Sequence, residues 1–246
     1  MAAGPIVTVD APPSNRCTIR WGEASARVTC STRADGDFHV EQDVEALLTR
    51  RRALVDLPWS QPDEVHGTDV LCVSRPSEHD LAVGDAVVTD LVGQVLGIWV
   101  GDCAPVAFLS ASGRIGGAHA GWKGLAAGVL EQTVAALRCG AAADVVAVLG
   151  PCIHPCCYEF GAADLTLMTD RLGPSVVGTT RDGLPALDVP AAVRAALAAV
   201  GVPVLAQLGG CTACDATQWF SHRARAERER QMMAIWRHPG EQEGCS

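Results

Sequence analysis

Short apolar runs that end in glycine or polar turns dominate the pattern along this chain, and runs of this kind predict buried strands. They lie at 69–73, 85–89, 95–100, 105–110, 115–120, 145–149, 202–208 and 231–236, and the loosely alternating segment 16–32 predicts two more short strands. Apolar residues at helical spacing predict helices at 40–55, 125–137, 163–172 and 189–200. Strands and helices alternate irregularly, with several strand-to-strand steps, so the pattern favours an α+β fold over a regular doubly wound sheet.

The same pattern predicts one domain with a tail at each end. Residues 1–15 contain three prolines and are expected to form a flexible N-terminal tail. Residues 16–238 form the expected single domain, without an internal repeat or linker, and residues 239–246 form a C-terminal tail. The segment 150–159 holds two prolines and three cysteines, so we expect a constrained loop there rather than a regular helix.

The composition narrows the class of protein. Of 246 residues, 48% are apolar, which allows a sizeable core, and the formal net charge is −9. A chain this acidic, with basic runs only at 50–52 and 223–230, is not expected to bind nucleic acid. No apolar run approaches the roughly 20 residues of a membrane span, and the N-terminus lacks the basic start and apolar core of a secretion signal. We therefore expect a soluble, cytoplasmic protein without a membrane partner.

The cysteines suggest thiols rather than disulfides. Eleven occur without a secretion signal, and because their number is odd a disulfide framework is the weaker interpretation. Most are expected to be small buried side chains. The pair Cys211-x-x-Cys214 resembles half of a zinc knuckle or a redox pair. A lone pair favours a structural role, unless Cys152, Cys156 or Cys157 joins it.

Three residues at predicted strand ends form the strongest candidate for a reactive site. His66, Cys103 and His119 each lie in or near a turn that contains glycine. Two imidazoles and one thiolate suit Zn²⁺ and leave a fourth position open for water, whose pKa zinc lowers toward neutrality. Separations of 37 and 16 residues (66 to 103 and 103 to 119) match no short zinc signature, so three unrelated structural roles remain an alternative. A shared ion requires the ligating atoms to lie within about 4 Å of one another, and separations beyond about 7 Å would exclude it.

The same residues also suit a metal-free mechanism. Cys103 would be a thiolate nucleophile, and His119 would be its base. Asp102 would orient the imidazole or, alternatively, cap a turn.

Basic residues near these segments are candidates for binding phosphate. They are Arg33, Lys123 and Arg223, and the alternative for each is a solvated surface position. His154 and His222 are further possible ligands, although a lone loop histidine more often only forms a hydrogen bond.

Several blocks of the sequence resemble one protein family. They are Val65-His66-Gly67-Thr68-Asp69-Val70, Asp102-Cys103-Ala104-Pro105-Val106, Ala118-His119-Ala120-Gly121-Trp122-Lys123-Gly124-Leu125, Gly150-Pro151-Cys152-Ile153, Cys156-Cys157-Tyr158-Glu159, Cys211-Thr212 and Phe220-Ser221-His222-Arg223. In this order they resemble the laccase-domain proteins, a family named multicopper polyphenol oxidase, purine nucleoside phosphorylase and peptidoglycan-editing factor. The chain departs from the family pattern at Glu64, where Gln is usual, at Lys123, where Arg is usual, and at His222, where Tyr is frequent.

The resemblance implies a single domain built on a β-sandwich core of mixed strands flanked by helices, as a monomer or weak homodimer. It implies a zinc site made by His66, Cys103 and His119, and a phosphate-binding role for Arg33. The implied activity is phosphorolysis of adenosine, inosine, guanosine and S-methyl-5'-thioadenosine to the base and ribose 1-phosphate, with adenosine deamination as a side activity. In deamination, Asp102 or Glu64 would act as the proton shuttle.

Three alternatives stay open beside this hypothesis. The peptidoglycan-editing name favours a cysteine hydrolase or amidase that acts on a cell-wall precursor. A laccase-like copper oxidase is the least favoured named activity, because multicopper centres are built mostly from many histidines and only two of the seven histidines lie in the candidate site. A binding protein without catalysis would bind its ligand tightly and turn over neither class of substrate.

Overall fold

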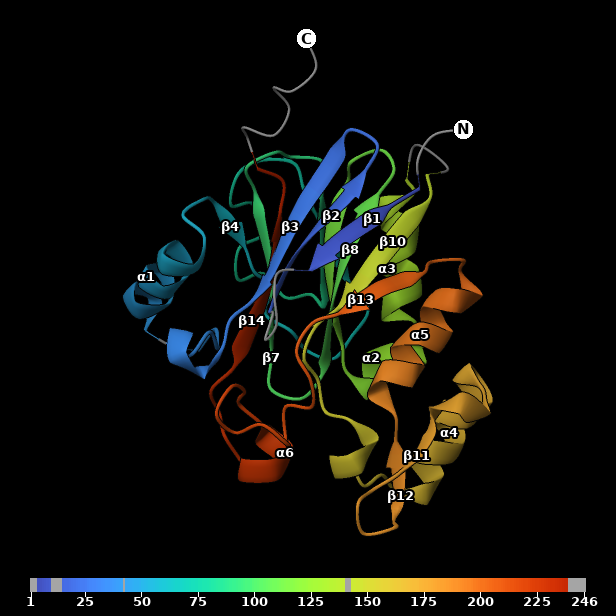
Figure 1. The fold of residues 1–246 in the computed structure, drawn as a ribbon. Coiled ribbons are helices and arrows are strands. Elements are labelled where there is room, and N and C mark those ends of the chain that lie inside the picture. The colour runs from blue at the N-terminus through green and yellow to red at the C-terminus, as the bar shows by residue number, and fades with distance from the viewer. Residues whose placement is uncertain (1–3, 10–14, 42, 140–142, 239–246) are drawn as a thin grey trace.

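Two six-stranded sheets stacked face to face form the centre of the computed structural model, which describes residues 4–9, 15–41, 43–139 and 143–238 (Figure 1). The first sheet has the order β1 (Ile6–Val9), β2 (Arg16–Trp21), β3 (Ala24–Cys30), β14 (Gln231–Trp236), β7 (Val95–Val100) and β4 (Trp59–Ser60). The second has the order β13 (Val204–Gln207), β10 (Val145–Leu149), β8 (Ala104–Ser110), β9 (Ile115–Ala120), β6 (Ala86–Thr89) and β5 (Val70–Val73). The pairs β4–β7, β5–β6 and β10–β13 are parallel, within otherwise antiparallel sheets. The predicted α+β fold with a β-sandwich of mixed strands is confirmed.

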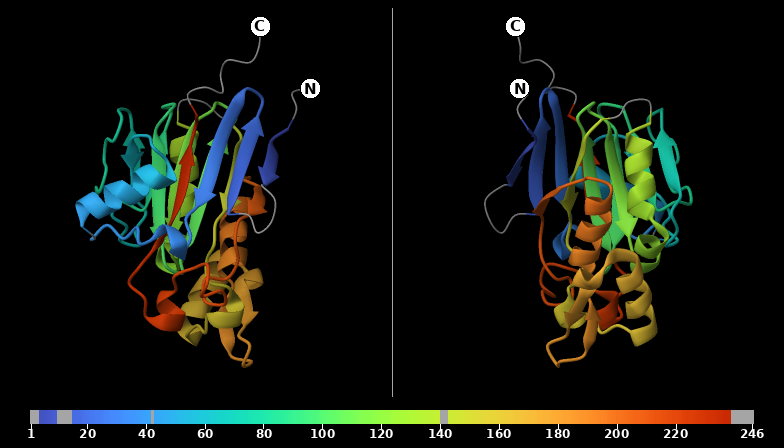
Figure 2. Two further views of the ribbon diagram at one scale, coloured as in Figure 1. Left: turned by 60° about the vertical axis from the view of Figure 1, so that its left-hand side comes forward. Right: turned by 90° about the vertical axis from the view of Figure 1, so that its right-hand side faces the viewer.

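Helices flank the sandwich on both sides (Figures 1 and 2). One side carries α1 (Val44–Leu54), and the other carries α2 (Trp122–Ala127), α3 (Val129–Leu137), α4 (Ala162–Leu172) and α5 (Val189–Ala199). The short helix α6 (His222–Arg225) and the hairpin of β11 (Val177–Thr179) and β12 (Pro185–Leu187) lie at one end of the molecule, and 3₁₀ turns occur at η1 (Arg33–Asp35), η2 (Pro155–Cys157) and η3 (Pro174–Val176). None of the helices in the described ranges combines the length and apolar character that a membrane crossing requires.

Strand β8 shows how the sequence produces two packed layers. Side chains alternate between the two faces of a strand. Val106 and Phe108 pack in the cluster formed with the helices, whereas Ala107 and Leu109 pack in the cluster between the sheets. All residues of β8 are buried because both of its faces are covered, which explains the continuous apolar run at 105–110.

The expected N-terminal tail is partly ordered. Residues 6–9 form β1, which pairs with β2 and places Val7 opposite Ile19, so this part of the tail prediction is wrong. The segment pairs its backbone with the edge of β2, and Val7 packs against the cluster between the sheets. Residues 1–3, 10–14 and 239–246 lie outside the described residues, so the rest of the tails and the limits 16–238 stay predictions.

Two further local predictions are corrected by the backbone. The helix expected at 125–137 begins earlier, at Trp122, and is divided into α2 and α3 by Gly128, whose φ is 96°. A left-handed residue ends a helix, and glycine adopts this conformation without steric cost. The segment 173–186, where the apolar pattern predicts neither a helix nor a strand, contains η3 and most of the β11–β12 hairpin.

Candidate metal centre and active site

The antiparallel pairing of β8 and β9 brings the predicted cysteine and histidine together. Ala104 pairs with Ala120 and Pro105 with His119, so Cys103, directly before β8, lies at the end of β9. His66 reaches the same point from the loop between β4 and β5. One ligating atom from each of the three residues lies within 4.8 Å of the others. This spacing is below the limit that would exclude a shared ion.

The three side chains contact one another but differ in their exposure to solvent. Cys103 Sγ lies 3.7 Å from His66 Nε2. The rings of His66 and His119 meet edge to face, with their centroids 4.7 Å apart. His119 is buried and His66 is exposed, so the group lies at the boundary between core and solvent. One side of it is therefore open to a ligand.

Asp85, which no sequence pattern singled out, contacts both the His119 ring and the backbone of the loop that carries His66. Its Oδ1 lies 2.9 Å from Nδ1 of His119, which leaves Nε2 of that ring as the nitrogen available to a metal. The same carboxylate accepts hydrogen bonds from the backbone N–H groups of Val65, His66 and Gly67. These contacts hold His66 in the left-handed region, at a φ of 62° that is uncommon outside glycine. Burial raises the pKa of Asp85, but hydrogen bonds from His119 and Gly67 outweigh it and keep the pKa below its ordinary value.

Glu64 places a second buried carboxyl group beside the same ring. Its Oε2 lies 3.6 Å from His119 Nδ1, and its Oε1 accepts the backbone N–H of Trp99 at 2.9 Å. Burial raises the pKa of Glu64 well above its ordinary value, against the opposing charge of His119. Burial also raises the pKa of the Cys103 thiol, but the charge of His119 and hydrogen bonds with both imidazoles outweigh it and lower the pKa to about 6. A thiol whose pKa is lowered and a carboxyl group whose pKa is raised therefore lie beside the same imidazole.

Asp102 does not take the orienting position predicted for it. Its Oδ1 accepts hydrogen bonds from the hydroxyl groups of Thr212 and Ser221, at 2.6 and 2.7 Å, and its Oδ2 accepts the backbone N–H of Arg223 at 2.7 Å. The carboxylate thus anchors the start of α6, because two hydroxyl groups and a backbone N–H from distant parts of the sequence donate to it. This arrangement matches the turn-capping alternative, and Asp85 occupies the place beside the imidazole.

A cavity of about 500 Å³ opens above the His–Cys–His group. Its wall combines the aromatic rings of Trp99, Trp122 and Tyr158 with the cationic side chains of Lys123, Arg223 and Arg230. The guanidinium of Arg223 lies over the Tyr158 ring, 4.6 Å from its centroid. Flat apolar faces and positive charges together suit a ligand that has both an aromatic ring and an anionic group.

The other predicted residues are placed differently. Arg33 is not among the residues that line the cavity; it pairs with Glu227 at 2.5 Å and lies over the Phe220 ring. His222 does line the cavity, whereas His154 contacts the side-chain amide of Gln207. The structure therefore brings Lys123 and Arg223, but not Arg33, to the candidate site.

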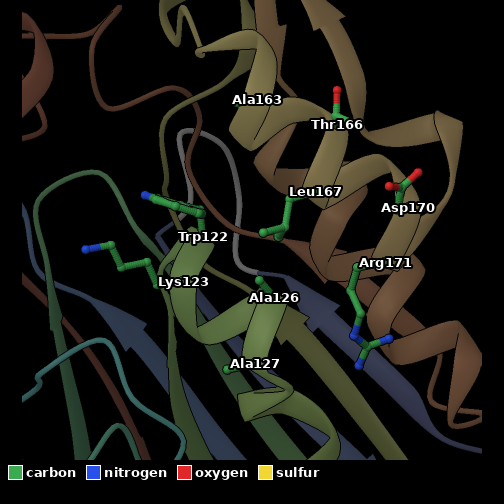
Figure 3. Close-up of a pocket in the computed structure, with 9 residues that line it drawn as sticks. All are labelled: Trp122, Lys123, Ala126, Ala127, Ala163, Thr166, Leu167, Asp170 and Arg171. Atoms are coloured by element: carbon green, nitrogen blue, oxygen red, sulfur yellow. The ribbon is translucent and has the colours of Figure 1, made fainter.

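A second hollow, of about 990 Å³, lies between α2 and α4 (Figure 3). It shares Trp122 and Lys123 with the first, and Leu167 of α4 points toward α2 within it. Its lining lacks the histidine and cysteine side chains, with Asp170 and Arg171 as its other charged groups. We therefore place the candidate active site in the first cavity.

The donor set fits one transition-metal ion. In tetrahedral zinc sites the bonds are about 2.0–2.1 Å to nitrogen and 2.3 Å to sulfur, so neighbouring donors lie about 3.3–3.8 Å apart. The 3.7 Å between Cys103 Sγ and His66 Nε2 agrees with that range. Asp85 supplies the outer carboxylate that orients a metal-ligating histidine. His66, Cys103 and His119 would hold the ion and leave a fourth position toward the cavity.

Comparison with known proteins gives consistent results over most of the chain. A family model described as multi-copper polyphenol oxidoreductase laccase matches residues 16–238. The chain is 31% identical to the purine nucleoside phosphorylase YlmD of Geobacillus stearothermophilus, over 80% of this chain and 81% of the relative. It is 36% identical to the purine nucleoside phosphorylase SCO2081 of Streptomyces coelicolor, over 89% and 93% of the two chains. The crystal structure of YlmD from Geobacillus stearothermophilus matches this fold with a TM-score of 0.76 at 28% identity, covering 90% of this chain and 96% of that chain.

Proposed function

We propose that this chain, which belongs to the multi-copper polyphenol oxidoreductase laccase family, is a zinc-dependent purine nucleoside phosphorylase. The observation that carries the proposal is one cavity that joins the His–Cys–His group to aromatic faces and cations. Relatives more than 30% identical are named purine nucleoside phosphorylases, which supports the reaction class. The proposed substrates are adenosine, inosine, guanosine and S-methyl-5'-thioadenosine, each with phosphate.

In the proposed reaction, a phosphate oxygen forms a bond to C1' of the ribose while the bond from C1' to the purine nitrogen breaks. The base leaves with a proton, and the sugar becomes ribose 1-phosphate or, from S-methyl-5'-thioadenosine, 5-methylthioribose 1-phosphate. Arg223 and Lys123 would neutralise the phosphate, since guanidinium and ammonium groups bind phosphate oxygens strongly. Trp99 and Tyr158 would hold the base between aromatic faces.

Glu64 is our candidate for the proton transfer, because it is the carboxyl group that both lines the cavity and lies beside His119. A zinc ion bound by the three ligands would supply Lewis-acid polarisation of an oxygen. The same groups support adenosine deamination as a side activity. We further propose a cytoplasmic enzyme that is a monomer or a weak homodimer.

A cysteine hydrolase that acts on a cell-wall precursor is the second candidate. The contact between Cys103 and His66 is the observation that favours it, because a nucleophilic thiol needs a neighbouring base. A laccase-like copper oxidase is less favoured, because the group provides one thiolate and two imidazoles for a single ion.

Purified protein incubated with adenosine or inosine, with and without phosphate, tests the proposal. We expect adenine or hypoxanthine and ribose 1-phosphate only with phosphate present, and inosine from adenosine in its absence. Cys103→Ala should abolish turnover, whereas Cys72→Ser, at an exposed cysteine outside the site, should preserve it. Exhaustive chelation should remove the activity and zinc should restore it. Failure to release a base or to form inosine would exclude both nucleoside activities, and activity that resists chelation but not thiol alkylation would favour the hydrolase.

A further inference from the structure

A second group of potential metal ligands lies in the described part of the chain, apart from the His–Cys–His group. Cys156 and Cys157 belong to the 3₁₀ turn η2, and Cys211 and Cys214 belong to the loop that follows β13. The sulfur atoms of all four lie within 4.8 Å of one another. The Cys-x-x-Cys pair noted in the sequence therefore has a second pair opposite it.

The sulfur positions match the corners of a tetrahedron around one ion. With zinc–sulfur bonds of about 2.3 Å, the edges of such a tetrahedron measure about 3.8 Å. Cys156 Sγ lies 3.7 Å from Cys157 Sγ, 4.0 Å from Cys211 Sγ and 3.5 Å from Cys214 Sγ. Cys157 Sγ lies 3.5 Å from Cys214 Sγ. Four thiols converge at the spacing of a tetrathiolate site.

We propose that Cys156, Cys157, Cys211 and Cys214 bind one zinc ion in a structural site, distinct from the ion held by His66, Cys103 and His119. Soft thiolate ligands in tetrahedral geometry select zinc among the common divalent ions. Four protein ligands fill the coordination shell and leave no open position, which is the arrangement of structural rather than catalytic zinc.

Neighbouring donors complete the site. The backbone N–H of His154 donates to Cys211 Sγ at 3.4 Å, and the guanidinium of Arg181 donates to Cys214 Sγ at 3.0 Å. Zinc with four thiolates carries a net charge of −2, and the nearby guanidinium offsets part of it. The backbone N–H of Arg181 also donates to the carbonyl of Cys156, which ties the β11–β12 hairpin to η2. Hydrogen bonds of this kind orient metal ligands before the ion binds.

The proposed ion would connect two loops beside the candidate active-site cavity. Tyr158, which follows Cys157, lines the cavity, and Thr212, which follows Cys211, donates to Asp102. Zinc between the two loops would hold Tyr158 at a fixed separation from Thr212, which contacts the cavity residue Asp102. Its loss should loosen the cavity wall while leaving the His–Cys–His ligands in place.

Metal analysis of the reduced, full-length protein tests the proposal. We expect about two zinc ions per chain in the wild type, and about one in the double variant Cys156→Ser/Cys214→Ser and in Cys103→Ala. The matched control Cys72→Ser/Cys139→Ser, which changes two exposed cysteines outside both groups, should keep about two. If the wild type and both double variants hold the same number of ions, the proposal is overturned.

Two measurements on proteins with an intact four-cysteine group test the proposal even if the double variant misfolds. Cobalt-loaded Cys103→Ala should show the sulfur-to-metal charge-transfer bands of a tetrathiolate centre. Mercurial titration of the wild type should release both zinc ions into a chromophoric chelator. A native mass lower by two hydrogens per bridge would reveal disulfides instead, and iron in place of zinc would give its own visible spectrum. Either result would overturn the zinc assignment.

Discussion

Gly121→Ala should weaken binding of the proposed metal ion without unfolding the protein, because the added methyl group meets two of the proposed ligands. A Cβ at this position would lie 2.7 Å from His66 Cδ2 and 3.1 Å from Cys103 Sγ. Ordinary contact begins at 3.4 Å, so the imidazole must move by about 0.7 Å (3.4 minus 2.7). Metal–ligand bonds tolerate deviations of only about 0.2 Å. A displacement of this size is comparable to the loss of an outer-shell partner, which costs about 10–100-fold in metal affinity.

The chain offers a matched control for this variant. Gly121 is the N-cap of α2 with a φ of −70°, and Gly161 is the N-cap of α4 with a φ of −63°. A Cβ at Gly161 would meet nothing within 4 Å, so Gly161→Ala changes the same kind of cap without touching a ligand. Both variants should lose about 1 kcal/mol or less of unfolding free energy, since alanine is a poorer N-cap than glycine. Competition with a chromophoric chelator gives the zinc affinity of each protein. Equal affinities for Gly121→Ala, Gly161→Ala and the wild type would refute the steric argument.

Four further variants test contacts inside and outside the candidate site. Asp85→Asn removes the carboxylate that contacts the His119 ring and accepts hydrogen bonds from three backbone N–H groups. Zinc affinity, measured by chelator competition, should fall about 10–100-fold. The unfolding free energy, measured in urea, should fall by about 1–3 kcal/mol. Arg223→Ala should raise the KM for phosphate about tenfold or more in steady-state assays, as loss of one charge-assisted contact predicts, whereas Arg33→Ala should lower the urea midpoint and leave that KM unchanged. The pKa of Glu78 is lowered from 4.5 to about 2, chiefly by its hydrogen bond with Arg75. The ionised carboxylate therefore stabilises the fold fully above pH 4.5, and this stabilisation is lost as the pH falls toward 2. The urea midpoints of Glu78→Gln and the wild type should differ at pH 7 and converge as the pH falls through that range.

Local patterns in the sequence predict much of the fold and part of the site. The runs at 105–110 and 115–120 become β8 and β9, because each is a continuous apolar strand covered on both faces. Once these strands pair, Cys103 and His119 must lie near each other. The meeting of Cys103 and His119 is therefore the part of the site that residue type and strand order make predictable, whereas the family resemblance is needed to place His66 beside them.

Other features depend on contacts that no local pattern encodes. Asp85 contacts the His119 ring because β6 and β9 pair with Ala86 opposite Ala118. The sequence alone does not fix that register. The four-cysteine group joins residues 58 positions apart, as between Cys156 and Cys214. Arg33 has the residue type of a phosphate ligand, yet its guanidinium pairs with Glu227, 194 positions away.

The hydrogen bonds from three backbone N–H groups to Asp85 bear on whether His66 reaches its position before or after a metal ion binds. Three protein hydrogen bonds close the loop that carries His66, so we expect it to be ordered before an ion binds. Small zinc fingers behave oppositely, since they stay unfolded until metal arrives. Calorimetry of zinc addition should thus show little heat-capacity change, because almost no apolar surface becomes buried. We therefore predict that the polypeptide folds first and binds the proposed ion afterwards, so that donor chemistry and the metal available to the finished fold would decide which ion it takes.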